Sequence, residues 1–132
     1  MTETPQPEQG AVLGLHHASL VVGDSRRAAS FYGDLLGLTQ VARPDLGFPG
    51  LWYDLGGGQT LHLLEVPNPD PSVRGVRPGR DRHLALRVGG VEPVVSRLEA
   101  AGLAVERSRS GRPAAFVRDP DGNTIELVET RR

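Results

Sequence analysis

Residues 57–65 read "GGQTLHLLE", and residues 122–129 read "GNTIELVE". The second stretch aligns with the first from Gly58 to Glu65, with identical or chemically similar residues at every position but one: a glutamate, Glu126, stands where the first stretch has a histidine, His62. Both stretches are largely apolar and start at a glycine, a pattern typical of strands that follow a turn. The chain therefore contains an internal repeat, and a repeat of this kind decides the architecture.

Two further blocks repeat in the same order. The stretch "HHASLVVGD" (16–24) aligns with "RHLALRVGG" (82–90), 66 positions further on. The stretch "LLGL" (35–38) aligns with "AAGL" (100–103). With a spacing that drifts by only two residues across the three blocks, the chain reads as two copies of one half-domain pattern.

Each half of the chain predicts one strand, one helix and three further strands. In the first half we expect the helix at 24–36, with Asp24 or Ser25 as its N-cap and Gly37 as its C-terminal stop. In the second half we expect it at 91–102, with proline in the first turn. The strands are expected at 14–22, 38–43, 50–55 and 59–66 in the first half, and at 83–88, 103–108, 113–118 and 123–129 in the second.

The predicted fold class is α+β, with two tandem βαβββ modules. One such module alone leaves a sheet face uncovered and a strand edge unpaired. We therefore expect the modules to form a curved, barrel-like mixed sheet around a central cavity, with the helices outside. The expected organisation is a flexible tail at 1–12 and a single domain at 13–130, built from module one (13–66), a proline-rich connector (67–80) and module two (81–130).

Composition excludes several classes of function. The chain has 132 residues and a formal net charge of −1, so bulk charge favours neither nucleic acid nor an anionic membrane as a partner. No apolar run is long enough to span a bilayer, and the N-terminus has no secretion-signal pattern, so the cytoplasm is the expected location. Cysteine and lysine are both absent, which excludes thiolate and Schiff-base chemistry.

The histidines are the candidate metal ligands. His17 and His83 occupy equivalent strand positions in the two halves, and His62 is equivalent to Glu126. A lone strand histidine is more often a half-buried polar residue, but a glutamate in mid-strand is costly to bury unless a cation compensates it. Imidazole and carboxylate both suit a borderline divalent cation. We therefore predict a metal site from these four residues, whereas His16 should point to the opposite face from His17 and be structural.

The layout resembles the vicinal oxygen chelate superfamily, which includes glyoxalase I, bleomycin-resistance proteins, fosfomycin-resistance thiol transferases and extradiol dioxygenases. The resemblance covers nearly the whole chain, from Leu13 to Glu129, and is specific for the fold but loose for the function. It is carried by "LHHASLVVGDSRRAASFYGDLLGL" (15–38), "RHLALRV" (82–88) and "FVRDPDGNTIELVE" (116–129).

The resemblance also implies roles for particular residues. His17 and His83 match the two strand histidines of the superfamily, and Glu126 matches its C-terminal metal glutamate. His62 falls where some members place a further ligand, commonly glutamate in bacterial glyoxalase I, so it departs from that enzyme's pattern. The stretch "LHLLEVPNPDP" (61–71) is most similar to a glyoxalase-like subgroup.

The chemistry implied by the resemblance is metal-assisted. A divalent ion (Zn, Ni, Fe, Co or Mn) acts as a Lewis acid on adjacent oxygens of a small-molecule substrate, and Glu126 is the available general base for an isomerase- or lyase-type proton transfer. Alternatively, His17, His83 and Glu126 form a two-histidine, one-carboxylate face suited to Fe(II) and O₂, although His62 argues against this. A further alternative is a non-catalytic protein that sequesters a small molecule, as bleomycin-resistance proteins do.

The remaining predictions concern the residues that line the substrate pocket and the oligomeric state. Trp52 and Phe116 are the candidate substrate-binding residues, and Tyr53 should point away from Trp52. We also expect a homodimer with sites at the module interface, in which His17 and His62 of one chain meet His83 and Glu126 of the other. Four arginines of the connector region form either a solvated loop or an anion-capturing lip over the cavity; they are Arg74, Arg77, Arg80 and Arg82.

Overall fold

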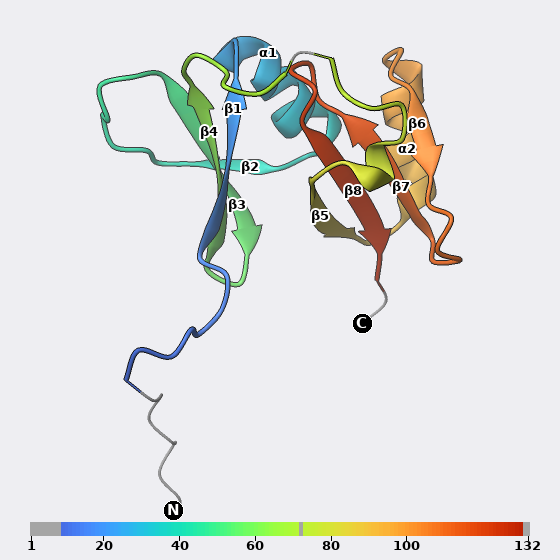
Figure 1. Cartoon of the computed structure of the whole chain (residues 1–132), viewed down its shortest axis with the longest axis horizontal. Coiled ribbons are helices and arrows are strands. Elements are labelled where there is room, and N and C mark those ends of the chain that lie inside the picture. Colours follow the sequence, from blue (N-terminus) through green and yellow to red (C-terminus); the bar gives the residue numbers. More distant parts are fainter. Residues whose placement is uncertain (1–8, 72, 131–132) are drawn as a thin grey trace, which may run out of the picture.

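The strands form two four-stranded sheets, one from each module (Figure 1). The computed structural model describes residues 9–71 and 73–130. The first sheet has the order β1-β4-β3-β2 and consists of β1 (His17–Val22), β2 (Thr39–Val41), β3 (Gly50–Gly56) and β4 (Gln59–Glu65). The second has the order β5-β8-β7-β6 and consists of β5 (His83–Val88), β6 (Val105–Arg107), β7 (Ala114–Arg118) and β8 (Thr124–Glu129).

The predicted α+β class with two βαβββ modules is confirmed. In each module a parallel pair, β1 with β4 and β5 with β8, carries two antiparallel strands on one side. Within the described residues the two curved sheets are not hydrogen-bonded to each other, so they do not close into a barrel. Consequently β1 and β5 each lie at a free edge of their own sheet.

The helices lie close to where the sequence predicts them. In the first module α1 (Ser25–Ala29) runs directly into a π-helix, η1 (Ser30–Leu35), and the second module contains α2 (Val91–Ala100). Asp24 is the N-cap of α1, as its side chain accepts hydrogen bonds from the backbone of the first turn. The connector contains a short 3₁₀ helix, η2 (Pro78–Arg80). The π-helical turn is a departure from the ordinary α-helix that the apolar spacing indicates.

The internal repeat extends to individual contacts. His17 lies opposite Thr60 in the first parallel pair, and His83 lies opposite Thr124 in the second. The last strand of each module also supplies a carboxylate to the first turn of its helix. Glu65 accepts from the Ser25 N–H at 2.7 Å, and Glu129 accepts from the Val91 N–H at 3.0 Å. A negative charge at a helix N-terminus is stabilising, so each module fixes its helix against its sheet in the same way.

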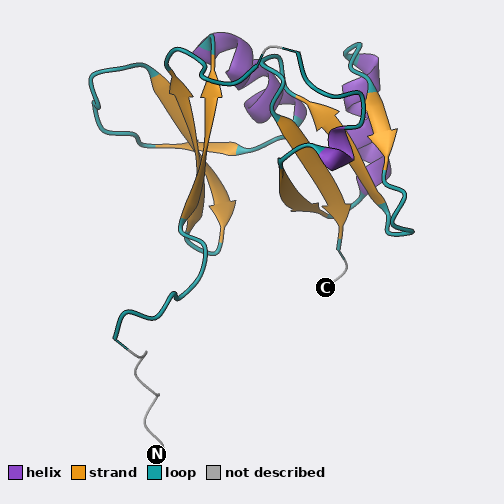
Figure 2. Cartoon of the chain, viewed as in Figure 1, coloured by secondary structure: helices purple, strands orange, loops and turns teal. Residues whose placement is uncertain are grey.

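The helices lie beside the sheets (Figure 2), and residues of both form one shared apolar core. It joins Tyr32 of η1 and Leu61 of β4 to Leu98 of α2 and Ile125 of β8, all of which are fully buried. Because strand side chains alternate, the residues next to these core positions point to the other face of each sheet. Each module thus has one face covered by helices and one face that its own helix leaves free.

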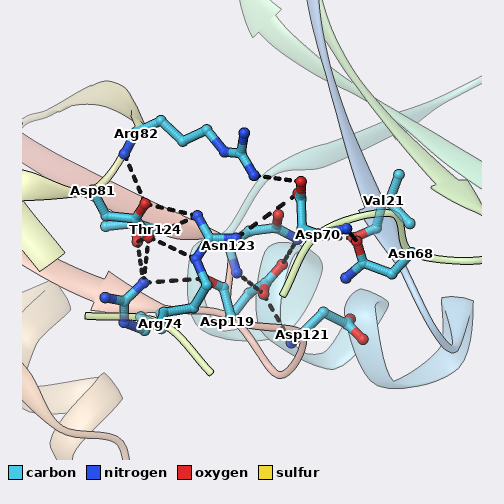
Figure 3. Close-up of polar contacts among 12 residues, drawn as sticks. Val21, Asn68, Asp70, Arg74, Asp81, Arg82, Asp119, Asp121, Asn123 and Thr124 are labelled. Atoms are coloured by element: carbon cyan, nitrogen blue, oxygen red, sulfur yellow. Dashed lines mark hydrogen bonds and ion pairs between the residues drawn. The ribbon is translucent and has the colours of Figure 1, made fainter. Parts of the chain in front are cut away.

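A buried carboxylate, Asp119, joins the two modules (Figure 3). It lies in the turn between β7 and β8 and accepts a hydrogen bond of 2.6 Å from the Tyr32 hydroxyl of the first module. The side chain of Asn123 donates both to Asp119 and to the Val21 carbonyl of β1, at 2.9 Å each. The sequence predicts only a turn at this place, whereas the structure shows that the turn also holds the modules together.

Ion pairs hold the connector against the second module (Figure 3). Asp81 accepts two hydrogen bonds from Arg74 and one from Arg118. Hydrogen bonds from Arg74 first, and then from Arg118, hold the pKa of Asp81 well below its usual range. Arg82 pairs with Asp70. Two of the four connector arginines are therefore engaged within the chain.

The N-terminal region adds no further element. Of the predicted tail at 1–12, residues 1–8 lie outside the described residues, and residues 9–12 are exposed and belong to no helix or strand. In the part of the chain that the structure describes, no helix has both the length and the apolar character needed to cross a membrane.

The module junction predicts a difference between two buried tyrosines. Replacing Tyr32 by Phe removes a hydrogen bond to buried, charged Asp119, and should lower the free energy of unfolding by about 1.5–3 kcal/mol in urea denaturation. Tyr53→Phe is the matched control, because Tyr53 is equally buried but its hydroxyl makes no hydrogen bond with the described residues. Equal stabilities of the two variants would contradict the role assigned to Asp119.

Candidate functional site

Three aromatic rings stack on the free face of the first sheet. The ring centroids of His17 and His62 are 4.1 Å apart with an interplanar angle of 17°. Trp52 covers the other side of His62, at 4.0 Å and 6°, because it lies directly opposite His62 in the β3–β4 register. Tyr53, the next residue along β3, is buried in the core. Of these two neighbouring aromatic residues, Trp52 is therefore the one whose ring lies on the same face of the sheet as the histidines.

Hydrogen bonds occupy one ring nitrogen of each histidine in this pair. The Thr60 hydroxyl lies 3.0 Å from Nε2 of His62, and Nδ1 of His16 lies 2.9 Å from Nδ1 of His17. Burial first, then the positive charges of His17, His16 and Arg43, lower the pKa of His62 below its ordinary value. A lowered pKa keeps this imidazole neutral near pH 7, which is the form that binds metals.

The expectation that His16 points away from His17 is wrong. The two rings are in edge-to-face contact, with centroids 5.1 Å apart. The expectation applied strand alternation to both residues, but β1 begins only at His17. His16 precedes the strand, and its side chain is therefore not bound by the alternation.

The second pair, His83 and Glu126, lies on the equivalent face of the second sheet. Nε2 of His83 is 3.2 Å from Oε1 of Glu126. Nδ1 of His83 donates to the Asp81 carbonyl at 2.8 Å. The Phe116 ring is edge-to-face with His83 at 5.2 Å, and Phe116 lies opposite Glu126 in the β7–β8 register. Arg112 reaches the other carboxylate oxygen, Oε2, at 3.5 Å.

This second pair has the electronic character of a cation site. Since Nδ1 of His83 donates to a carbonyl, the neutral ring carries its lone pair on Nε2. That lone pair faces a carboxylate oxygen, which is also an acceptor, so the contact requires a proton or a metal cation between the two atoms. Glu126 is only 6% exposed, and a buried carboxylate needs such compensation. An imidazole nitrogen beside a carboxylate oxygen fits a borderline divalent cation.

The four predicted ligands form two separate pairs. His17 and His62 lie together on the first sheet, and His83 and Glu126 lie together on the second. Within the described residues of a single chain, no group of three or more histidine, aspartate or glutamate side chains could hold a metal ion. One chain alone therefore does not bring all four ligands to one point.

The structure places one arginine at the site that the sequence analysis did not select, Arg112. It also divides the four connector arginines, which the sequence analysis treated as one group, into two pairs. Arg112, in the loop before β7, contacts Glu126, but its sequence context has no periodicity that would indicate this. Among the connector arginines, Arg74 and Arg82 form ion pairs with aspartates. Arg77 and Arg80 instead line a cavity together with His83 and Glu126.

Comparisons with known proteins agree with this layout. A family model described as "Glyoxalase/Bleomycin resistance protein/Dioxygenase superfamily" matches residues 14–127. The chain is 31% identical over 121 residues to Glyoxylase I 4 of Arabidopsis thaliana, covering 86% of this chain and 68% of that protein. A glyoxalase family protein from Bacillus anthracis superposes with a TM-score of 0.73 at 26% identity, covering 92% of this chain and 98% of that one. TnmS3, an antibiotic binding protein from a Streptomyces species, superposes with a TM-score of 0.69 at 28% identity, with the same coverage.

The ring stack predicts a pH-dependent fluorescence signal. Trp52 is the sole tryptophan of the chain, and an imidazolium stacked on an indole quenches its emission. Because the pKa of His62 is lowered, the quenching should set in below the ordinary histidine value of about 6.5 as the pH falls. His62→Gln should abolish this transition in a fluorescence titration, whereas His83→Gln should retain it. A transition that survives in His62→Gln would contradict the stacked arrangement.

Proposed function

The chain belongs to the Glyoxalase/Bleomycin resistance protein/Dioxygenase superfamily, and on that premise we propose that it is a divalent-metal-dependent enzyme acting on a small substrate through two adjacent oxygen atoms. The observation that supports this proposal is the contact between His83 and Glu126, in which Nε2 and Oε1 lie 3.2 Å apart and need a proton or a metal cation between them. The relative named Glyoxylase I 4 supports an enzymatic role within the superfamily.

The proposed site is shared between two chains. Each chain supplies two ligands on each of two sheet faces that its own helices leave free, and β1 and β5 have unpaired edges that a second chain can cover. In a homodimer, His17 and His62 of one chain then meet His83 and Glu126 of the other. Four such donors match the ligand number of a tetrahedral divalent ion, and a wider coordination sphere leaves positions for substrate oxygens.

The chain's own residues have distinct roles in this proposal. A bound divalent ion supplies Lewis acidity toward the adjacent oxygens of the substrate. Glu126 is the general base when it leaves or shares the metal: its carboxylate then takes a proton from a substrate carbon and returns it to the neighbouring carbon, as an isomerase- or lyase-type reaction requires. The hydrogen bond from His83 Nδ1 to the Asp81 carbonyl fixes the ring orientation. Trp52 and Phe116 form apolar walls beside the two pairs.

A second candidate function is non-catalytic binding of a small molecule. Two observations favour it: the similarity to TnmS3, an antibiotic binding protein, and the ring stack of Trp52, His62 and His17, which offers a flat aromatic surface. Metal analysis of protein purified without chelator separates the two candidates. About one equivalent of metal per chain supports the enzyme, and metal-free protein supports the binder.

Mixing two inactive variants tests whether the site is shared. One variant carries His17→Gln with His62→Gln, and the other carries His83→Gln with Glu126→Gln. Each variant alone should bind no metal, because every site in its dimer lacks one ligand pair. After unfolding and joint refolding, a mixed dimer contains one intact site and one site without ligands. Random pairing should therefore restore about a quarter of the wild-type metal content, measured by elemental analysis after removal of free metal.

The same experiment contains its own controls. Each variant refolded with itself should remain metal-free, and wild-type protein taken through the same procedure should regain its full content. If the mixture stays metal-free while refolded wild type binds normally, the shared-site proposal is wrong. If wild-type protein itself binds no divalent metal, the proposed enzyme function is wrong.

A further inference from the structure

A cavity of about 420 Å³ opens beside His83 and Glu126, and arginines form much of its wall. The 3₁₀ turn of the connector crosses Phe116 at Gly79, where a Cβ atom would come within 3.2 Å of the ring. Glycine thus allows the connector to approach the site closely, and the connector brings basic side chains with it. The arginines that line the cavity come from the connector and from the region of β6 and its following loop; they are Arg77, Arg80, Arg107, Arg109 and Arg112.

These arginines differ in how their charge is compensated. Arg107 forms a double contact with Glu92 and is thereby neutralised. Among the described residues, Arg77, Arg80 and Arg109 form no ion pair. The one carboxylate that pairs with Arg112 among the described residues is Glu126, at 3.5 Å, and the Arg112 side chain is 62% exposed. The cavity therefore contains more guanidinium groups than carboxylates, and it offers several donors to an incoming anion.

Arg112 and a metal ion would compete for the same carboxylate. Oε1 of Glu126 faces His83, and Oε2 faces Arg112. A divalent ion at this carboxylate would neutralise its charge and repel a guanidinium 3.5 Å away. Arg112 already lines the cavity together with Arg77 and Arg80. Its Nε donates to the Ser110 hydroxyl at 3.3 Å, which holds the side chain at the cavity wall. On losing Glu126 as its partner, the guanidinium would therefore face the cavity.

We propose that Arg112 exchanges one anion for another: it pairs with Glu126 in metal-free protein, and it binds an anionic group of the substrate once a metal occupies Glu126. This inference rests on the proposed metal-dependent function and deepens it, because it assigns the substrate to the class of small organic acids with a carboxylate, phosphonate or phosphate group. Binding of metal and of anion then reinforce each other, and this reinforcement is reciprocal. Arg112 is a substrate-binding and positioning residue in this scheme.

The test measures metal affinity without any enzymatic assay. Ni²⁺ is titrated into metal-free protein by calorimetry, in sodium chloride and in sodium sulfate of equal ionic strength. In wild-type protein sulfate should tighten Ni²⁺ binding about 5-fold or more, because it provides Arg112 with an alternative anion. In Arg112→Gln the affinity in chloride should already be higher than in wild type, since the competing cation is gone, and sulfate should have little further effect. Sodium acetate in a third arm distinguishes a planar carboxylate from a tetrahedral oxyanion.

Arg26→Gln is the matched control. Arg26 is exposed on α1 and does not line the cavity. The Arg26→Gln variant removes the same charge as Arg112→Gln but leaves the site unchanged, so it should behave like wild type in all three salts. If wild-type protein binds Ni²⁺ but Arg112→Gln shows the same affinity and the same response to sulfate and acetate, this inference is overturned and the metal site stands. If wild-type protein binds no Ni²⁺, the proposed function and this inference both fall.

Discussion

The arrangement of the molecule depends on one buried hydrogen-bonded carboxylate, Asp119, at the junction of the modules. By accepting from the Tyr32 hydroxyl and from Asn123, it fixes the second module's turn against the first module's helix and strand. An unpaired carboxylate at this depth would be costly, so the partners have to stay in place. The modules therefore meet through their helices and this turn, and α1, η1 and α2 do not cover the sheet faces that carry the histidines.

That geometry explains why the candidate ligands occur as pairs. The internal repeat places His17 and His62 on one sheet in the same register as His83 and Glu126 on the other, but within the described residues of one chain the two pairs do not come together. Each pair on its own supplies only part of a metal site. The first offers imidazole nitrogens stacked on an indole, and the second offers an imidazole nitrogen beside a carboxylate oxygen. Under the proposed function, a divalent ion held between two chains would be bound by both pairs.

The fold was largely predictable from the sequence, and the site only in part. Strand and helix positions follow from apolar spacing and from the glycines at element ends, and the repeat doubles the evidence for each. The π-helical turn at Ser30–Leu35 was not predictable, since it depends on how Phe31 and Tyr32 pack. The equivalence of His62 and Glu126 was readable, but the direction in which each module faces was not, because it depends on contacts such as Tyr32 with Asp119, 87 residues apart. Arg112 lay in a loop without periodicity.

Because the donors are separated into two pairs, the fraction of chains with a complete metal site would depend on the concentration of the protein. Among the described residues of a single chain, no three such side chains are grouped so that they could hold a metal ion, so a lone chain offers the ion only one pair of the proposed ligands. Under the shared-site proposal, the number of complete centres at low abundance rises with the square of the chain concentration, because each centre requires an encounter between two chains. Cells that make little of this protein would then have disproportionately little of the competent form, and dilution in a test tube would have the same effect.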